Sequence, residues 1–313
     1  MLTIDDPLIP QSHKDDPHMG VTVTAHIHHD TYDAINPRRL DLTGKSVFIT
    51  GASRGIGRSI AISYTQAGVS FIALAARGSM EATVEAVKVA AKAANRAMPT
   101  LLPLIVEASD PTSVEAAVKA TSTALNGKPL DILVNNAAVL EPNVILHKSD
   151  PADWWYTFEI NLKGVYLTSR AFIPLLLKAD TTTSRRGDRT IVNLTSQGGI
   201  RVMNGLSAYN TSKLAVCRLT EFLALEYAAE QLVTFSVHPG GVVSDMSKKL
   251  PDSLQSAITD TGELVGDSIV YLTRAPQPWL SGRYVSVLWD LQELEARKEE
   301  VEGKDLLKNK FVC

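Results

Sequence analysis

Seven short apolar runs recur along this chain, and helical patterns separate most of them. The runs lack the polar alternation of half-exposed strands, so they are typical of strands buried on both faces. They cover residues 45–49, 69–75, 100–106, 130–134, 190–194, 233–237 and 283–288. Helical periodicity is found at residues 58–67, 80–94, 113–125, 152–177 and 208–229. Strands alternating with helices in this way predict an α/β fold, with a parallel sheet covered on both faces.

Both ends of the chain lie outside this alternation. Residues 1–40 form an extension that is polar up to Pro17, and residues 21–27 alternate well enough for a short strand. The extension carries His13, His18, His26, His28 and His29. Histidines without cysteines or paired carboxylates are a poor metal site, so we expect a surface arm and no metal. The main domain then covers residues 41–290, and the charged residues 291–313 should form a surface helix or tail.

Composition and charge narrow the class of protein. The 313 residues are 45% hydrophobic and 21% charged, which suits one large α/β domain. A net charge of −3 argues against a nucleic acid or an anionic membrane as partner. The two cysteines, Cys217 and Cys313, suggest no structural disulfide. The sequence carries no recognisable secretory signal, membrane span or lipidation motif, so we expect a cytoplasmic protein.

A glycine-rich turn follows the first apolar run. Residues 50–57 read Thr-Gly-Ala-Ser-Arg-Gly-Ile-Gly and lead directly into a helical pattern. A pyrophosphate can approach backbone N–H groups at a helix N-terminus only where no side chain intervenes. Gly51 permits the tight turn, Gly55 the close approach, and Gly57 close packing of helix on strand. The turn predicts a dinucleotide site, with an ordinary glycine-rich βα turn as the alternative.

Tyr209 and Lys213 lie four residues apart in the helix expected at residues 208–229, so they share one face. A free phenol titrates near pH 10, and a nearby cation lowers its pKa by favouring the phenolate. Ser196 follows the strand at residues 190–194 and offers a hydroxyl that can polarise a carbonyl. The alternative is that the Tyr-x-x-x-Lys pair is a solvated helix face, as most such pairs are.

Two other strand ends carry small or amide side chains. The third run leads to Glu107-Ala108-Ser109-Asp110 and the fourth to Asn135-Asn136-Ala137-Ala138. Small residues let a cofactor lie flat against the backbone, and asparagine side chains can tie neighbouring strand ends together. A plain turn is the alternative at either position.

Taken in order, these elements resemble the short-chain dehydrogenase/reductase family over residues 41–288. The resemblance implies a Rossmann-type, doubly wound parallel sheet in three layers and a single catalytic domain. The catalytic residues that it implies are Asn161, Ser196, Tyr209 and Lys213. It also implies that Asn161 holds Lys213 through a water molecule. Residues 29–37 and 280–284 look like those of fungal members of the family.

The same resemblance implies a set of cofactor contacts along the strand ends. These residues are Gly51, Ser53, Arg54, Gly55, Ile56, Gly57, Arg77, Glu107, Ala108, Asn136, Ala137, Ala138, Tyr209, Lys213, Pro239, Gly240, Val242 and Ser244. Residues 239–244 look like the segment that passes the nicotinamide amide, with Ser244 where threonine is usual. Glu107 stands where the family usually has an aspartate that contacts adenine. The polar loop at residues 179–188 is longer than typical.

The end of the second apolar run favours NADP(H) over NAD(H). An NAD site needs a carboxylate there for the ribose 2′-hydroxyl, whereas the sequence reads Ala75-Ala76-Arg77. Arg54 lies inside the glycine turn, and two guanidiniums suit a 2′-phosphate because arginine can bind it bidentately. The alternative is that either arginine is solvated surface.

The resemblance implies an NADP(H)-dependent oxidoreductase that reduces a ketone or oxidises the secondary alcohol. Candidate pocket segments are residues 139–147, 197–204 and 244–261. Their apolar members are Met203, Val243, Met246 and Leu250. They favour a medium-sized hydrophobic small molecule, and the fungal resemblance suggests secondary metabolism. A non-redox epimerase or dehydratase of the same fold, and a catalytically silent NADP-sensing protein, stay open as alternatives.

The helices expected at residues 152–177 and 208–229 are long and apolar over more than one face. Helices too apolar for solvent indicate a subunit interface, and the family resemblance implies pairing through them. We therefore expect a homodimer or homotetramer, with burial inside the monomer as the alternative.

Overall fold

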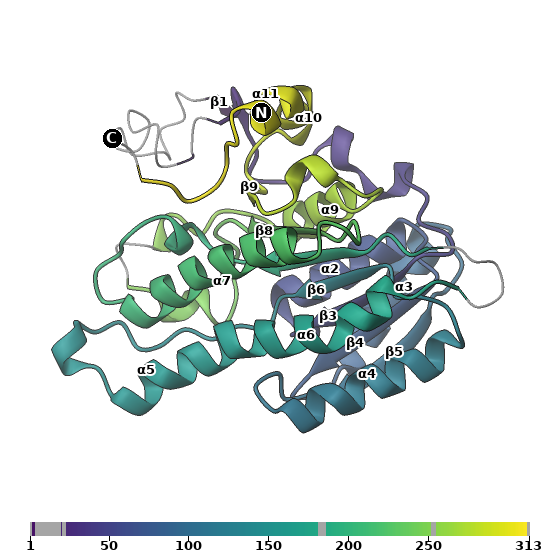
Figure 1. The fold of residues 1–313 in the computed structure, drawn as a ribbon, viewed down its shortest axis with the longest axis horizontal. Helices are drawn as coiled ribbons and strands as arrows, with labels where there is room; N and C mark the ends of the chain where they lie inside the picture. The colour runs from purple at the N-terminus through teal and green to yellow at the C-terminus, as the bar shows by residue number, and fades with distance from the viewer. Residues whose placement is uncertain (1, 4–19, 21–22, 181–185, 252–254, 312–313) are drawn as a thin grey trace.

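The computed structural model describes residues 2–3, 20, 23–180, 186–251 and 255–311. A seven-stranded sheet, parallel at every neighbouring pair, lies at the centre of the molecule (Figure 1). The strands are β3 (Ser46–Thr50), β4 (Phe71–Ala76), β5 (Thr100–Ile105), β6 (Ile132–Asn135), β7 (Thr190–Leu194), β8 (Val233–His238) and β9 (Tyr284–Ser286). Each apolar run of the sequence analysis therefore contains one of these strands. The bounds of the strands differ from the bounds of the runs by at most a few residues.

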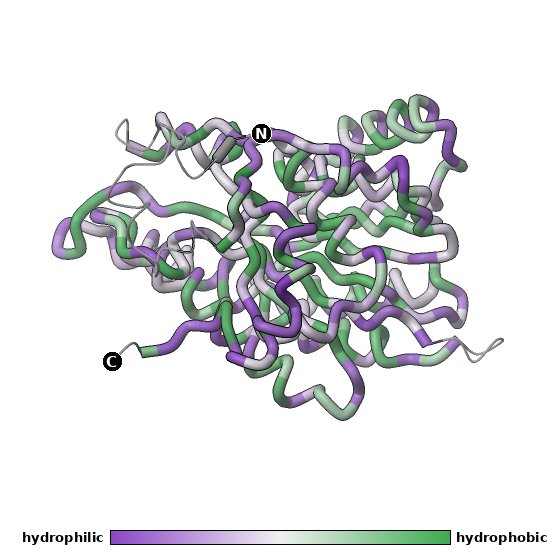
Figure 2. The backbone as a smooth tube through the Cα atoms, turned by 90° about the horizontal axis from the view of Figure 1, so that it is seen from above, coloured by the Kyte–Doolittle hydropathy of each residue, from purple (hydrophilic) through white to green (hydrophobic). Residues whose placement is uncertain are grey.

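Helices cover both faces of this sheet. One layer contains α2 (Gly55–Gln66), α3 (Glu81–Ala93) and α9 (Gly262–Leu272). The other contains α4 (Pro111–Leu125), α6 (Gly164–Leu177) and α7 (Ser207–Glu226). In Figure 2 hydrophobic segments run through the middle of the molecule between these layers. The doubly wound, three-layer α/β fold in a single domain is confirmed.

Strand β3 shows why the runs are continuously apolar. Val47 and Ile49 point into the core beneath α2, and Phe48 between them points into the core beneath α6. The rings of Phe48 and Phe172 lie 4.2 Å apart between centroids. Successive side chains of a strand face opposite sides of the sheet. A strand that is covered on both sides therefore has no position that faces solvent.

The order of the strands, β5-β4-β3-β6-β7-β8-β9, sets the place of the site. The chain runs from β3 outward to β4 and β5, then returns to β6 on the other side of β3. A crevice forms where the order reverses, beyond the carboxyl ends of the strands. The glycine turn after β3 and Asn136 after β6 therefore meet at the same edge of the sheet.

Helix α9 was missed by the sequence analysis. Every residue from Leu264 to Leu272 is buried, including Asp267 and Ser268. The polar side chains of α9 lie inside the protein, where Asp267 accepts hydrogen bonds from Ser63 and Thr31, so the helix has no exposed face over these residues.

The helix expected at residues 152–177 contains an irregular turn. The α-helix α5 (Pro151–Phe158) passes into a π-helical turn, η5 (Glu159–Lys163), and then into α6. The N–H of Gly164 donates to the carbonyl oxygen of Glu159, five residues back. Such turns carry one extra residue in the helix and are frequent at functional sites. Asn161 lies in this turn and is fully buried.

The N-terminal extension is not a surface arm over its described length. Ile27 and Ile35 are buried in the core beneath α9, and β2 (His26–Ile27) pairs antiparallel with β1 (Leu2–Thr3). Among the described residues of the strand expected at 21–27, His26 and Ile27 alone form a strand. His13 and His18 lie outside the described residues.

The C-terminal segment forms two surface helices, α10 (Leu291–Ala296) and α11 (Lys298–Gly303), each of which packs one side on the core. The alternative of a tail does not apply to these residues. Leu291 and Leu294 of α10 and Val301 of α11 are buried in the same cluster as Ile35. In Figure 1 these yellow helices lie beside the purple N-terminal ribbon. The two ends of the chain thus fold against each other. The loop expected at 179–188 is described only at its ends.

Candidate active site

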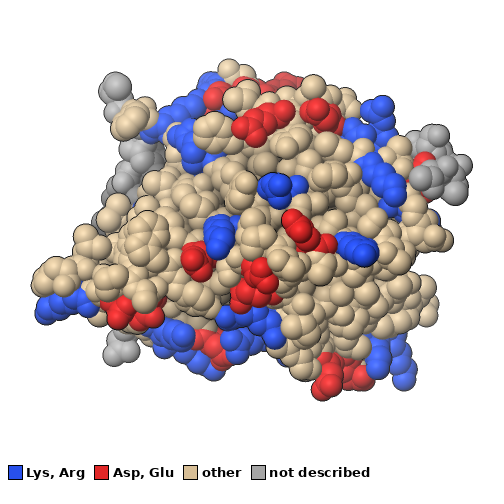
Figure 3. Space-filling model, turned by 60° about the horizontal axis from the view of Figure 1, so that its bottom comes forward, with Lys and Arg blue, Asp and Glu red and all other residues tan. Residues whose placement is uncertain are grey.

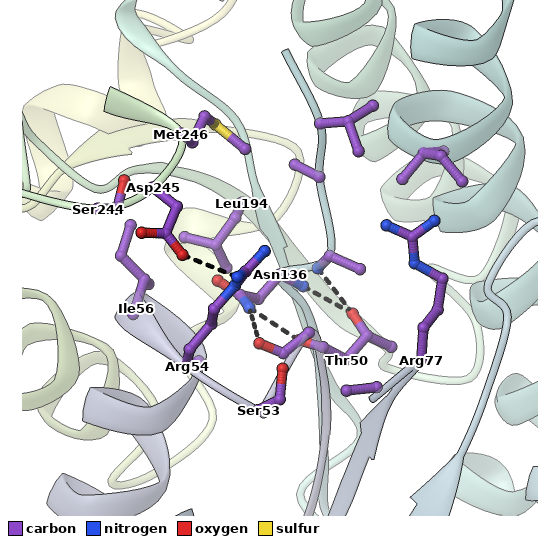
Figure 4. A pocket seen from close by; sticks show the side chains of 18 of the residues that line it. Thr50, Ser53, Arg54, Ile56, Arg77, Asn136, Leu194, Ser244, Asp245 and Met246 are labelled. Atoms are coloured by element: carbon purple, nitrogen blue, oxygen red, sulfur yellow. Dashed lines mark hydrogen bonds and ion pairs between the residues drawn. The ribbon is translucent and has the colours of Figure 1, made fainter. Parts of the chain in front are cut away.

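A cleft of about 1020 Å³ opens beyond the carboxyl ends of β3, β4, β6 and β7. Most residues expected to contact a cofactor line it: Gly51, Ser53, Arg54, Gly55, Ile56, Gly57, Arg77, Glu107, Ala108, Asn136, Ala137, Ala138, Tyr209, Lys213, Pro239 and Ser244. Gly240 and Val242 do not line the cleft, and neither do Asn161 and Ser196. Figure 4 looks into it, with Thr50 and Asn136 between the two arginines.

The glycine turn is shaped by close backbone approaches. Gly51 and Gly55 have positive φ, +66° and +53°. A side chain on Gly51 would meet Ala137 and Asn136, and one on Gly57 would collide with the carbonyl oxygen of Gly51. The N–H groups at the start of α2 are therefore left open to the cleft, which is the arrangement that binds phosphate at a helix N-terminus.

Asn136 ties the end of β6 to the end of β3. Its Nδ2 donates to the carbonyl oxygens of Thr50, at 2.8 Å, and Gly51, at 3.2 Å. The backbone N–H groups of Asn136 and Ala137 both donate to the hydroxyl of Thr50. The small side chains of Ala137 and Ala138 then leave the floor of the cleft clear.

The cleft carries more positive than negative side chains. Its basic residues are Arg54, Arg58, Arg77, Lys213, Lys248 and Lys249, and its acidic residues are Glu81, Glu107 and Asp245. The protein as a whole has a net charge of −3, so the excess of cations is local. Such a cleft attracts an anionic ligand.

Arg54 and Arg77 reach the cleft from different strand ends. Nη1 of Arg54 lies 2.7 Å from Oδ2 of Asp245, as Figure 4 shows, and both side chains are largely exposed. Nη1 of Arg77 donates to the hydroxyl of Tyr156 at 2.5 Å and lies 3.8 Å from Glu107. Exposed pairs of this kind are weak, so a bound phosphate can replace either partner.

At the other end of the cleft, Tyr209 and Ser196 meet. Tyr209 lies in the first turn of α7, Ser196 follows β7, and the Ser196 hydroxyl is close enough to the phenol to lower the pKa of Tyr209. Nζ of Lys213 lies 5.7 Å from the centroid of the Tyr209 ring and donates to the carbonyl oxygen of Leu194 at 2.8 Å. The fold thus brings together a hydroxyl pair and an ammonium group from β7 and α7.

The pKa of Tyr209 differs from the sequence expectation. Burial raises the pKa of this phenol above its usual value, the hydrogen bond with Ser196 lowers it, and the charge of Glu141 raises it. The lowering expected from Lys213 is not found in this structure, where the largest effect on the pKa of Tyr209 is burial, which penalises the phenolate. Burial also lowers the pKa of Lys213 to about 8.

Asn161 joins the π-helical turn to two neighbouring elements. Its Oδ1 accepts from the N–H of Val139 at 2.8 Å, and its Nδ2 donates to the carbonyl oxygen of Val139 and to Ser212. Ser212 precedes Lys213 in α7, so Asn161 supports the helix turn that carries the lysine. The water-mediated link from Asn161 to Lys213 stays a prediction.

Glu141 was missed by the sequence analysis. It is buried, and its Oε1 accepts from the backbone N–H of Tyr209 at 2.9 Å. Leu206 at the start of α7 has no side chain that could cap the helix, so Glu141 satisfies one of its free N–H groups from outside. No local motif marks this residue, because its partner lies 68 positions further along the chain.

Surface and metal-binding features add little to the site. On the face drawn in Figure 3, acidic and basic side chains are interspersed among uncharged ones. Within the described part of the chain, no helix is both long and apolar enough to cross a bilayer. The same residues contain no group of three or more histidines, cysteines or carboxylates that could hold a metal ion.

Comparison with known proteins agrees with this site. Residues 45–255 match the family model described as short chain dehydrogenase. The chain is 45% identical to the short chain dehydrogenase mpl6 of Monascus purpureus, covering 95% of this chain and 98% of the relative. It is 41% identical to the short chain dehydrogenase pigC of Monascus ruber, covering 93% and 94%.

Solved structures with a similar fold include dehydrogenases. A short-chain dehydrogenase/reductase from Mycobacterium marinum superposes with a TM-score of 0.65 at 26% identity, covering 79% of this chain and 94% of that one. Carveol dehydrogenase from Mycobacterium avium, solved in complex with NAD, has the same fold, with a TM-score of 0.65 at 23% identity over 80% of this chain and 99% of its own. The chain belongs to the short-chain dehydrogenase/reductase family, whose oxidoreductases use a nicotinamide cofactor.

Proposed function

We propose that this protein is a cytoplasmic, NADP(H)-dependent oxidoreductase that reduces a ketone of a medium-sized, largely apolar small molecule. The observation that carries the proposal is the meeting of Tyr209, Lys213 and Ser196 at one end of the cleft, with the ammonium group 5.7 Å from the Tyr209 ring centroid. The similarity to fungal short chain dehydrogenases makes secondary metabolism a suitable context.

In the proposed reaction, Ser196, Tyr209 and Lys213 have different roles. Ser196 and Tyr209 donate hydrogen bonds to the carbonyl oxygen of the substrate and polarise it. Tyr209 then gives its proton to the oxygen as negative charge develops there. Lys213 stabilises the phenolate that remains and binds the ribose of the cofactor. NADPH, when bound, supplies the hydride to the carbonyl carbon.

The cleft fits a dinucleotide phosphate. Its glycine turn places the N-terminus of α2 at the cleft, and the space where a side chain of Gly55 would stand is open up to Ser244, 4.0 Å away, which suits a pyrophosphate. β4 ends at Ala76 with Arg77 next, so no carboxylate stands directly after the strand to bind a ribose 2′-hydroxyl. Arg54 and Arg77 would hold the 2′-phosphate instead.

NADPH should bind at least about tenfold more tightly than NADH, because guanidinium–phosphate contacts are strong charge-assisted hydrogen bonds. Replacing both Arg54 and Arg77 by alanine should remove most of that preference and leave NADH affinity nearly unchanged. Calorimetry with both cofactors measures this, with Arg218→Ala on the exposed surface of α7 as the control. Equal affinities in the unmodified protein would exclude the NADP(H) assignment.

An apolar substrate is supported by a second cavity of about 530 Å³. Two of the three expected pocket segments meet there, since Val144, Ile145 and Leu146 face Val202 and Met203. From the third segment, Val243 and Met246 line the cleft itself. A medium-sized ketone with apolar flanks suits walls of this composition.

We expect a homodimer or homotetramer in solution. The helices α5, α6 and α7 leave large apolar side chains exposed: Trp155, Tyr156, Tyr166, Phe222 and Leu225. Light scattering at micromolar concentration should give a multiple of the monomer mass of 33.9 kDa. Phe222→Asp should shift the mass toward the monomer, and Val89→Asp, on exposed α3, should not. A monomer mass for the unmodified protein would contradict the interface.

A further inference from the structure

Three histidines of the N-terminal extension each face a carboxylate from the last part of the chain. His26 pairs with Glu293, and Nε2 of His28 lies 2.9 Å from Oδ2 of Asp290, so both hold the extension against α10. Nδ1 of His29 lies 2.5 Å from Oδ1 of Asp260. Asp260 is not part of α10, and its surroundings connect the extension to the cleft.

Asp260 is fixed between His29 and the backbone of Gly241. Its side chain is 2% exposed. Oδ2 accepts from the N–H of Gly241, and the N–H of Asp260 donates to the carbonyl oxygen of Gly241 at 2.9 Å. Nδ1 of His29 and Oδ1 of Asp260 share the second hydrogen bond, so both carboxylate oxygens of Asp260 are engaged.

The two glycines beside Asp260 allow this close approach. Gly240 has a φ of +75°, and a side chain there would collide with the carboxylate of Asp260. A side chain on Gly241 would collide with the backbone of Ala257. Gly240 therefore leaves room for the carboxylate of Asp260, and Gly241 leaves room for the backbone of Ala257.

The segment that Asp260 holds forms one wall of the cleft. The cleft is lined by Pro239, directly before the glycines, and by Val243 and Ser244, which begin two residues after Gly241. β8, which leads into Pro239, pairs with β7, which leads to Ser196. The held wall thus borders the catalytic end, whereas Arg77 after β4 lies on the opposite side of β3.

The extension is joined to this wall by more than one contact. The N–H of Thr261 donates to the carbonyl oxygen of His29 at 3.0 Å, and its hydroxyl donates to Oδ1 of Asp30 at 2.7 Å. These bonds keep His29 and Asp260 side by side. The family model begins at residue 45, so it does not contain this part of the molecule.

We propose that His29 and Asp260 are positioning residues of the cofactor site: His29 orients the Asp260 carboxylate, and Asp260 holds residues 239–244 in place beside Tyr209 and Lys213. The N-terminal extension is then part of the active site. The proposal rests on the NADP(H) function given above.

The test compares two ligands by calorimetry. NADPH spans the whole cleft, whereas adenosine 2′,5′-bisphosphate carries only the half that faces Arg77. His29→Ala should weaken NADPH binding by about tenfold, the loss typical of a hydrogen bond to a charged group. It should weaken binding of the bisphosphate by at most about threefold, because Arg77 lies on the opposite side of β3 from this wall and only Arg54, through Asp245, approaches it.

Matched variants separate positioning from general damage. His29→Asn keeps a donor close to the place of Nδ1 and should restore NADPH affinity to within about threefold of the unmodified protein. His26→Ala breaks the neighbouring pair in the same extension and should bind both ligands normally. Asp260→Asn keeps the shape of the side chain but loses one of the two hydrogen bonds of the carboxylate. It should therefore weaken NADPH binding as His29→Ala does, and it tests the proposal independently if His29→Ala folds poorly.

Three results would overturn the proposal: normal NADPH affinity in His29→Ala and Asp260→Asn, equal weakening in His26→Ala, or equal loss of both ligands in the His29 variant. If the unmodified protein binds NADH and not NADPH, the cofactor assignment fails instead. The same variants are then measured with NADH and adenosine diphosphate ribose, and the proposal predicts the same selective loss with NADH.

Discussion

Tyr209→Phe should lower turnover by about 10²–10⁴-fold and leave NADPH affinity within about twofold. The ring and its packing stay in place, but the proton donor of the Ser196–Tyr209 pair is lost. Negative charge would then develop on the substrate oxygen with only Ser196 to stabilise it. Single-turnover oxidation of NADPH measures the rate, and calorimetry measures the affinity.

Tyr227→Phe is the control for this substitution, since Tyr227 follows the C-terminal end of α7 and lines neither cavity. It should have normal activity. If Tyr209→Phe keeps a tenth or more of the activity, Tyr209 is not the acid and the proposed mechanism is wrong.

Lys213→Ala should lower both the rate and the cofactor affinity, by about 100-fold and about tenfold respectively. The ammonium group lies near the Tyr209 ring and donates to the carbonyl oxygen of Leu194. Its loss removes the charge that stabilises the phenolate and the expected contact to the ribose. The same two assays measure these losses, with Lys119→Ala on α4 as the control. A variant that loses rate and keeps full affinity would remove Lys213 from the cofactor site.

A pH dependence accompanies this prediction. Burial lowers the pKa of Lys213 to about 8 before any cofactor binds. An anionic cofactor favours the charged form, so binding raises this pKa and takes up a proton when the pH is above 8. NADPH affinity should therefore fall as the pH rises beyond about 8 in the unmodified protein, and Lys213→Ala should lose this dependence.

Six of the seven strands were predictable because they are buried throughout, whereas β5 at the edge of the sheet has no buried residue. In β3, Val47, Phe48 and Ile49 all need to be apolar whichever layer they face, so the run is visible without any structure. Helix α9 was missed, and the sequence does not show that its polar residues Asp267 and Ser268 are buried in the core. The π-helical turn was not predicted either, because Asn161 and Gly164 are weak helix formers but do not by themselves indicate a hydrogen bond across five residues.

The site was predictable where its residues are close in sequence and missed where they are distant. The glycine turn and the Tyr209–Lys213 pair each lie within one short segment. Glu141 meets Tyr209 across 68 positions, and His29 meets Asp260 across 231. The expected lowering of the Tyr209 pKa was wrong because the sequence does not reveal how deeply the phenol is buried.

The most direct test of the central claim is hydride transfer itself. NADPH deuterated on the transferred face of nicotinamide C4 is incubated with the protein and a panel of apolar ketones, and the alcohols are examined by mass spectrometry. We predict one deuterium at the new carbinol carbon for each cofactor oxidised, and at least about 100-fold less deuterated alcohol in the same time with Tyr209→Phe. A protein that binds NADPH but leaves it reduced across the panel, or converts a substrate without taking up deuterium, would contradict the claim that it is an NADP(H)-dependent ketone reductase.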